Sequence, residues 1–375
     1  MKIAQIAPIA ERVPPKKYGG TERVIYALTE ALVKKGHKVT LFASGDSVSS
    51  ARLISVVPKS LREFRFPDIY GSNLYSLMNG GLAYSMNEKF DIIHDHNPGL
   101  NLPMASLSRT PVVTTWHGPF SPLTARYFKT FDKVPVVAIS KSQKASAPGV
   151  NFAATVYNGL DMEHYPFSDQ PDKYLLYVGR IDPEKGTHIA IELAVKLKIK
   201  LVIAAKLDRD VLHIADYFKK EVEPRLRRHS DLVKWIGEVD EGERNELMKK
   251  ALCLLHPITW PEPFGLTMIE AMACGCPVVA LGLGSVSEVV INGKTGFVAS
   301  DFTGLAEGVK KIGKISRSAC REYSLKNFNS SRMAEGYETV YYNIIQERRR
   351  NTNPWTSNHQ TKTIFGTLGL TPSSS

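Results

Sequence analysis

Short apolar segments alternate with amphipathic helical segments along most of this chain, and this alternation restricts the fold more than any other feature of the sequence. The helical stretch 21–37, for example, lies between two apolar segments of strand length, 2–8 and 38–44. Further apolar segments of this kind are found at 90–96, 110–118 and 134–140. Parallel strands covered by helices on both faces are apolar throughout, so the pattern predicts an α/β fold with a doubly wound parallel sheet.

The alternation stops at residues 156–174, which contain Asn158-Gly159 and two prolines, and then begins again. A helical stretch at 186–198 follows the first of the new strand segments. The apolar segments of this second part are 174–180, 199–205, 232–238, 253–258 and 277–282. Because the same pattern occurs twice, we expect two Rossmann-like domains that face each other across a cleft.

The expected boundaries follow from these patterns. Residues 1–165 form the N-terminal domain, 166–173 the linker and 174–325 the C-terminal domain. Residues 326–350 are expected to form a helix that packs back on the N-terminal domain. The segment 351–375 is rich in Thr, Ser, Asn and Pro, and we expect it to be disordered.

The composition is that of a globular protein, with 43% hydrophobic and 23% charged residues. The formal net charge of +11 favours anionic partners such as phosphorylated small molecules or acidic lipid headgroups. No basic–aromatic pattern for stacking bases accompanies the charge, so we do not expect nucleic acid as a partner. Four cysteines are too few for a disulfide scaffold, which favours the reducing cytoplasm. Peripheral contact with the inner membrane face stays open, because the charge suits it.

Polar residues at the carboxyl ends of parallel strands are the first place to look for a ligand site. Gly19 and Gly20 come after the first strand segment and open the first long helix. Glycines let the backbone approach a phosphate, and a helix N-terminus offers free N–H groups. A loop hinge would also explain the same two glycines, so the pair alone does not distinguish a phosphate-binding loop from a hinge.

Three histidines follow strand segments in the first half of the chain. His117 ends the segment 110–118 beside a glycine, where it would exchange a hydrogen bond with a substrate, although a structural role fits as well. His94 and His96 share one face of a strand, but no further ligands are spaced to complete a metal site. We therefore expect no metal, and we expect these two side chains to line the same cleft.

Two cations mark the beginning of the second half. Arg180 ends a strand segment, and Lys185 precedes the next helix. Arg as a planar fork and Lys as a point charge are suited to hold a diphosphate. The alternative is a pair of surface charges near Asp182 and Glu184.

Two carboxylates, Glu262 and Glu270, lie eight positions apart in an otherwise apolar stretch. Prolines and a glycine place Glu262 on a loop, whereas Glu270 falls in the early part of a helix. The helix begins near Phe264, Gly265 and Leu266, whose N–H groups favour an anion. The carboxylates would then bind sugar hydroxyls, or, without any ligand, stabilise the helix N-terminus. Cys274 and Cys276 are expected to be packing residues.

Together these features resemble the retaining glycosyltransferases of family 4, which have the GT-B fold. The resemblance covers most of residues 1–345. It rests on Gly19, Gly20, His117, the segment 158–161, Arg180, Lys185, and the pair Glu262 and Glu270. It implies a nucleotide-diphosphate sugar as donor, transfer of a hexose to an acceptor hydroxyl with retention of configuration, and no essential metal or other cofactor.

The resemblance also implies a role for each residue. Arg180 and Lys185 would neutralise the diphosphate, and Glu270 would bind the ribose. The amides of Phe264, Gly265 and Leu266 would, with Glu262, hold the transferred sugar and the phosphate. His117 would contact the sugar from the first domain, against which the acceptor, a sugar, polyol or lipid-linked glycan, would lie.

One departure and two alternatives remain. Lys206-Leu207-Asp208 stands where many relatives have a glycine-rich turn, and Glu238 lies where contacts to the nucleobase are expected. A nucleotide-sugar epimerase of the same architecture is one alternative, although the pair Glu262 and Glu270 favours a transferase. A non-catalytic nucleotide-sugar binder is the other, and the intact set of charged residues argues against it.

Overall fold

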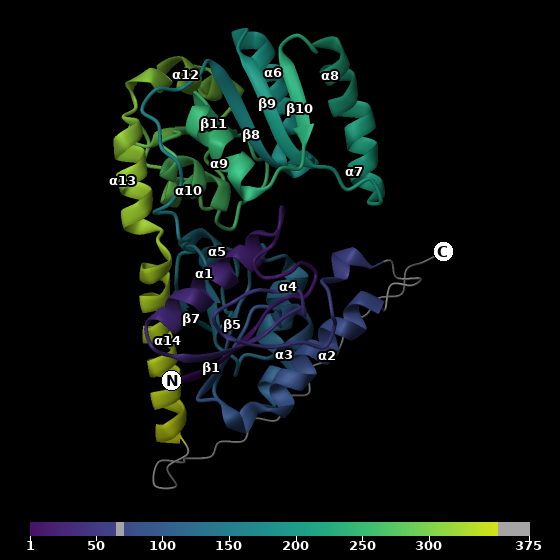
Figure 1. Cartoon of the computed structure of the whole chain (residues 1–375), viewed down its shortest axis with the longest axis vertical. Helices are drawn as coiled ribbons and strands as arrows, with labels where there is room; N and C mark the ends of the chain where they lie inside the picture. Colours follow the sequence, from purple (N-terminus) through teal and green to yellow (C-terminus); the bar gives the residue numbers. More distant parts are fainter. Residues whose placement is uncertain (65–70, 352–375) are drawn as a thin grey trace.

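The computed structural model describes residues 1–64 and 71–351, and its two parallel sheets lie one above the other along the long axis of the molecule (Figure 1). The first sheet has seven strands in the order β3-β2-β1-β4-β5-β6-β7. Its strands are β1 (Lys2–Ile6), β2 (Lys38–Phe42), β3 (Arg52–Ile54), β4 (Ile92–Asp95), β5 (Val112–Thr115), β6 (Val136–Ala138) and β7 (Phe152–Thr155). The order changes direction between β1 and β4, and ligands bind at such a point in doubly wound sheets.

The second sheet has six strands in the order β10-β9-β8-β11-β12-β13, with its change of direction between β8 and β11. Its strands are β8 (Tyr174–Arg180), β9 (Lys200–Lys206), β10 (Val233–Gly237), β11 (Cys253–His256), β12 (Val278–Leu281) and β13 (Gly296–Ala299). The predicted α/β fold with two Rossmann-like domains, the GT-B architecture, is therefore confirmed. The central strands β4, β5 and β11 are buried along their whole length, as helices on both faces require.

Helices cover both faces of each sheet (Figure 1). In the first half they are α1 (Gly20–Lys34), α2 (Gly71–Ser85), α3 (Pro98–Ser106), α4 (Pro122–Thr130) and α5 (Lys141–Ser146). In the second half they are α6 (Thr187–Leu197), α7 (Leu212–Tyr217), α8 (Glu223–Arg228), α9 (Glu241–Lys250), α10 (Leu266–Ala273), α11 (Val286–Val289), α12 (Phe302–Lys311) and α13 (Arg317–Asn327). None of the helices within the described residues has the length and apolar character needed to cross a bilayer.

The last helix, α14 (Ser330–Asn351), runs back along the first domain and packs against α1 and β5 (Figure 1). Two of its tyrosines, Tyr337 and Tyr341, are fully buried there. On the surface, Glu338 accepts hydrogen bonds from His37 at 2.7 Å and pairs with Lys35 at 2.9 Å. The described part of the chain thus begins and ends on the same domain. The segment expected to be disordered lies, from residue 352 on, outside the described residues.

Candidate functional site

A cavity of about 520 Å³ lies between the two domains, at the carboxyl ends of strands from both sheets. Nine of the ten residues singled out from the sequence line it: Gly19, Gly20, His117, Arg180, Lys185, Glu262, Phe264, Gly265 and Leu266. The tenth, Glu270, lies behind the wall. Of the described residues that line the cavity, six are cations (Lys17, Arg23, Arg180, Lys185, Lys206, Arg244) and four are carboxylates (Glu11, Glu22, Glu238, Glu262), so the balance favours an anionic ligand.

The N-terminus of α1 reaches the cavity without a capping side chain, because its N-cap residue is Gly19. Gly19 has a φ of +142°, and a Cβ there would come within 2.7 Å of Cβ of Pro15. A Cβ at Gly20 would lie 3.2 Å from Cδ1 of Leu266 in the other domain. These glycines therefore bring a free helix N-terminus against the second domain, where its N–H groups can meet an anion.

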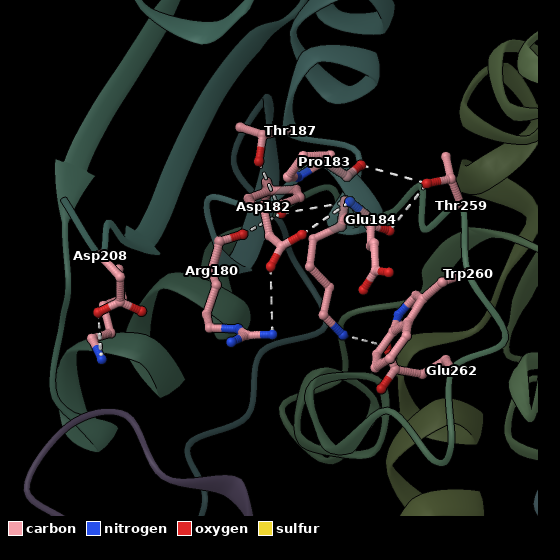
Figure 2. A network of polar contacts seen from close by, with 12 residues as sticks. Arg180, Asp182, Pro183, Glu184, Thr187, Asp208, Thr259, Trp260 and Glu262 are labelled. Atoms are coloured by element: carbon pink, nitrogen blue, oxygen red, sulfur yellow. Dashed lines mark hydrogen bonds and ion pairs between the residues drawn. The ribbon is translucent and has the colours of Figure 1, made fainter. Parts of the chain in front are cut away.

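The end of β8 is shaped by a short capped turn. Asp182 follows the strand, and its carboxylate accepts a hydrogen bond from the N–H of Glu184 at 3.1 Å. This turn brings Lys185 to the cavity just before α6. Arg180 lies beside it, with Nη2 3.6 Å from the Asp182 carboxylate, so its guanidinium stays close to the same rim (Figure 2).

Lys185 and Glu262 form a partly buried ion pair across the cavity wall. Nζ of Lys185 donates to Oε2 of Glu262 at 2.5 Å and lies 4.5 Å from the centre of the Trp260 ring. The indole N–H of Trp260 donates to the same carboxylate oxygen at 3.2 Å. Burial raises the pKa of Glu262, but the charge of Lys185 and the hydrogen bonds from Lys185 and Trp260 outweigh burial, and the pKa is lowered overall. Glu262 is therefore ionised at neutral pH.

The backbone of the loop that carries Glu262 packs closely against Gly284. This glycine has a φ of +64°, and a Cβ there would lie 2.3 Å from the backbone nitrogen of Glu262. The N–H of Ser285 donates to the carbonyl of Glu262 at 2.9 Å. Only glycine combines this close approach with a left-handed backbone. The position of the Glu262 loop therefore depends on Gly284.

Glu270 is fully buried in α10, where it joins the two domains. Its Oε1 accepts hydrogen bonds from Arg23 of α1 and, at 2.8 Å, from Arg244 of α9. Burial raises the pKa of Glu270, but the two guanidinium groups lower it further than burial raises it. Its Oε2 has no hydrogen-bond partner among the described residues. Arg23 and Arg244 line the cavity and stand between it and the carboxylate.

His117 enters the cavity from the loop after β5. Its Nε2 lies 3.0 Å from Nδ1 of His96, and burial lowers the pKa of His117 to about 4, so the ring is neutral. The expectation that His94 and His96 line the cleft is wrong. Both are buried behind it, and each uses both ring nitrogens in hydrogen bonds to protein groups. Their strand passes through the middle of the sheet, where no ligand reaches them.

Several lining residues were not foreseen from the sequence. His256 ends β11 and lines the cavity, and burial lowers its pKa to about 4. Glu22, in the first turn of α1, is 6% exposed, and burial raises its pKa to about 7. The rule that polar residues follow strand ends would have found His256. No such rule indicates Glu22, Trp260 or Arg244, because helix faces and loops carry many similar residues.

The remaining expectations concern groups around the cavity. Glu238 lines it and accepts hydrogen bonds from the N–H of Tyr18 at 3.0 Å and from Arg62 at 2.8 Å. Cys274 and Cys276 are fully buried in the apolar core. Within residues 1–64 and 71–351, no three His, Cys, Asp or Glu side chains are grouped to hold a metal ion.

Two family models match consecutive parts of the chain. Residues 18–164 match the model described as Glycosyltransferase Family 4. Residues 164–326 match the model described as Glycosyl transferases group 1. The first match covers the N-terminus of α1 and His117, and the second covers Arg180, Lys185, Glu262 and Glu270.

Relatives and solved structures agree with these matches. A glycogen synthase from Mycobacterium tuberculosis is 26% identical, over 82% of this chain and 86% of that protein. A phosphatidyl-myo-inositol mannosyltransferase from the same species is 26% identical, over 79% and 82%. Sucrose-phosphate synthase from Thermosynechococcus elongatus superposes with a TM-score of 0.76 at 19% identity, over 92% of this chain and 99% of that one. Anabaena HepE in complex with UDP and glucose superposes with a TM-score of 0.69 at 19% identity, over 92% and 100%.

Proposed function

Because the chain belongs to the glycosyltransferases, its two domains matching family 4 and group 1, we propose that it transfers a hexose from a nucleotide-diphosphate sugar to an acceptor hydroxyl with retention of configuration. The observation that carries the proposal is the cavity between the domains. It combines an excess of cations with an ionised carboxylate, Glu262, and two helix N-termini, at the edge where doubly wound sheets bind ligands.

In this proposal, Arg180 and Lys185 bind the diphosphate. Lys185 has three N–H donors, of which one is used by Glu262, so it can reach a phosphate oxygen without leaving the carboxylate. The amides of Phe264, Gly265 and Leu266 lie at the start of α10 and favour the same negative charge. Glu262 accepts hydrogen bonds from hydroxyls of the transferred sugar.

His117 contacts the sugar from the first domain, and Glu270 receives the ribose hydroxyls. The second assignment requires Arg23 to withdraw, because the carboxylate is fully buried and Arg23 lies over it. Gly19 and Gly20 leave room for the donor at the end of α1. The acceptor then lies against the first domain.

The chemistry needs little from the protein beyond binding. The bond between the anomeric carbon and the diphosphate oxygen breaks, and the acceptor oxygen bonds to that carbon on the same face. The acceptor proton passes to the departing diphosphate. Preorganised cations stabilise the charge that develops on the leaving group, and the cleft aligns the two reactants. No metal is required in this scheme, so we expect turnover to persist in the presence of a chelator.

Structural neighbours support the choice of donor class. The Anabaena protein was solved with UDP and glucose and with UDP-glucose. Glycogen synthase and the mannosyltransferase are names of enzymes that transfer hexoses. UDP-sugars are therefore the first donors to test, followed by GDP- and ADP-sugars.

The test is a panel of these nucleotide sugars, scored for thermal stabilisation and for slow release of nucleoside diphosphate to water. A ligand at about a hundred times its dissociation constant stabilises the fold by about 2.7 kcal/mol. We expect one nucleotide class to stabilise the protein and to be turned over. Stabilisation without release, in the presence of candidate acceptors, would indicate a non-catalytic binder and contradict the proposal.

A further inference from the structure

A buried chain of hydrogen bonds leads from the cavity to the last helix, α14. It begins at His117, whose Nε2 lies 3.0 Å from Nδ1 of His96. Nε2 of His96 lies 2.6 Å from Oε1 of Gln5 on β1, and the Gln5 amide donates to Oη of Tyr341 at 3.1 Å. Gln5 and Tyr341 are fully buried and His96 is 4% exposed. These contacts join four separate segments of the chain, and the function proposed above uses only the first of them.

The chain continues beyond Tyr341, and its direction follows from the Gln5 amide, whose Nε2 donates to Tyr341 while its Oε1 faces His96. Oη of Tyr341 lies 2.7 Å from Nδ1 of His94, and Nε2 of His94 lies 2.8 Å from Oγ1 of Thr115. Since the hydroxyl of Tyr341 accepts from the Gln5 amide, its own proton is free to be donated to His94. His94 then carries its proton on Nε2 and donates to Thr115. In this arrangement each of these contacts pairs one donor with one acceptor, as buried polar groups require.

The same direction determines which nitrogen of His117 carries the proton. Burial lowers the pKa of both His96 and His117, so each ring is neutral and has one N–H. Oε1 of Gln5 can only accept, which places the proton of His96 on Nε2 and leaves Nδ1 as an acceptor. His117 therefore donates through Nε2. Its Nδ1 keeps a lone pair, on a ring that lines the cavity.

We propose that Gln5, His96 and Tyr341 are positioning residues, which hold His117 as the Nε2–H tautomer and present its Nδ1 as a hydrogen-bond acceptor to a sugar hydroxyl. This inference rests on the proposed function, since it assumes that a sugar lies beside His117. It gives α14 a part in catalysis: the helix follows the second domain in sequence, and its docking on the first domain completes the support of His117. A hydroxyl that donates to a fixed Nδ1 is held in one orientation, which favours the aligned geometry of transfer.

The test compares Gln5→Met and Tyr341→Phe with Tyr337→Phe as a matched control. Tyr337 is also a fully buried tyrosine of α14, but its hydroxyl bonds to Thr115 at 3.0 Å and does not touch Gln5. Turnover is measured as release of nucleoside diphosphate from the donor found in the panel, together with the nucleotide dissociation constant. The tautomer of His117 is read from the ring-nitrogen shifts of protein labelled with ¹⁵N-histidine, which needs no substrate.

We expect turnover to fall about tenfold in Gln5→Met and Tyr341→Phe. Each variant removes a hydrogen bond that helps to orient His117, and a factor of about ten is the usual effect of one such bond. Nucleotide affinity should change less than twofold in both, and Tyr337→Phe should keep wild-type turnover. The wild-type spectrum should show the proton of His117 on Nε2, and Tyr341→Phe should shift it toward a mixture of tautomers.

A wild-type spectrum with the proton on Nδ1 would overturn the inference, since it would mean that the whole chain of hydrogen bonds runs in the opposite direction. Full turnover in both variants would overturn it as well. If Gln5→Met does not fold, Tyr341→Phe and the wild-type spectrum still decide. If no nucleotide sugar is turned over at all, the proposed function fails, whereas the spectra still test the tautomer.

Discussion

Lys185 is held from two sides, by the carboxylate of Glu262 and by the ring of Trp260. Because Lys185 is one of the two cations that we propose to bind the diphosphate, we expect Lys185→Ala to lower the affinity for nucleoside diphosphate about 10- to 100-fold, as the loss of a charge-assisted hydrogen bond does. Isothermal titration with the best nucleotide of the panel measures this. Lys206→Ala is the control, since Lys206 also lines the cavity but pairs with Asp208 at 2.7 Å. Equal losses in both variants would mean that only the total charge of the cavity matters.

Glu22 makes stability depend on pH. Burial raises its pKa from 4.5 to about 7 in the folded state. Between these two values the folded protein binds a proton that the unfolded chain does not, so stability falls as pH rises toward 7. We compare the free energy of unfolding of Glu22→Gln with that of the wild type at each pH. This difference should favour the variant by about 1–3 kcal/mol more at pH 8 than at pH 5.

Thermal unfolding of both proteins at the two pH values checks this prediction. Glu63→Gln, at an exposed position, is the control and should show the same difference from the wild type at both pH values. A melting-temperature difference between Glu22→Gln and wild type that does not change with pH would show that Glu22 is ionised in the folded protein throughout this range.

Whether a site residue could be predicted from the sequence depended on whether it lies at a strand end or on a helix face. His117 and Arg180 stand at or just past strand ends, and the sequence pattern indicates such ends. Arg23 is different, because it lies 247 positions before its partner Glu270 and sits on a helix face. From the sequence alone it resembles any solvated arginine, and only the packing of the two domains brings it to the carboxylate.

At the scale of elements, the central strands and one edge strand, β10, were predicted, whereas the other three edge strands were not. Strand β8 was predicted with its observed limits. It lies between β9 and β11 in the sheet, and most of its residues are apolar. Strands β3, β7 and β13 lie at the edges of the sheets and were missed. An edge strand needs apolar residues on fewer sides, so its short sequence, such as Arg52–Ile54, carries no periodic signal.

Arg317 of α13 is one of the residues that hold the linker between the domains to the second domain. The guanidinium of Arg317 donates to the carbonyls of Ser168, Ala251 and Lys249 at 2.7, 2.8 and 2.6 Å. It is 7% exposed, so water does not replace these bonds when they are lost. We expect Arg317→Met to destabilise the protein by about 2–4 kcal/mol, measured as the loss in thermal or urea unfolding.

Arg225→Met is the matched control for this prediction. Arg225 bonds to Glu192 and Glu221, both at 2.8 Å, but on the protein surface, where such pairs contribute about 0–1 kcal/mol. A loss of stability in Arg317→Met that is no larger than the loss in Arg225→Met would contradict the role of Arg317 in holding the linker. Unchanged nucleotide affinity in both variants would confirm that the effect is on stability alone.

At the scale of the whole molecule, side chains of each domain bond to the other domain, and three of these contacts involve Arg62, Glu288 and Arg23. Arg62 of the first domain bonds to Glu238 of the second at 2.8 Å. Glu288 accepts from the N–H groups of Lys141 and Ser142 at the start of α5, at 2.8 and 2.7 Å. The third contact, between Arg23 and Glu270, differs from these because it is buried at the cavity wall. It therefore closes the cleft and also covers the carboxylate assigned to the ribose.

This double position leads to a prediction about donor binding. If the ribose is to reach Glu270, the guanidinium of Arg23 must first withdraw, and part of the binding free energy is used to displace it. We expect Arg23→Met to raise the affinity for nucleoside diphosphate several-fold, since Arg244 alone still compensates the buried charge of Glu270. Titration calorimetry measures the affinity, and small-angle scattering shows whether the free protein opens.

Glu288→Ala separates the two effects of Arg23, because it removes another contact between the domains without touching Glu270. If opening of the cleft alone raised affinity, both variants would bind the nucleotide more tightly and would show a similar increase in radius of gyration. If Arg23 competes with the ribose, only Arg23→Met gains affinity, and the gain is absent for a diphosphate that carries no ribose. Weaker binding in Arg23→Met would instead mean that Arg23 is a ligand of the donor, and the assignment of Glu270 to the ribose would have to be abandoned.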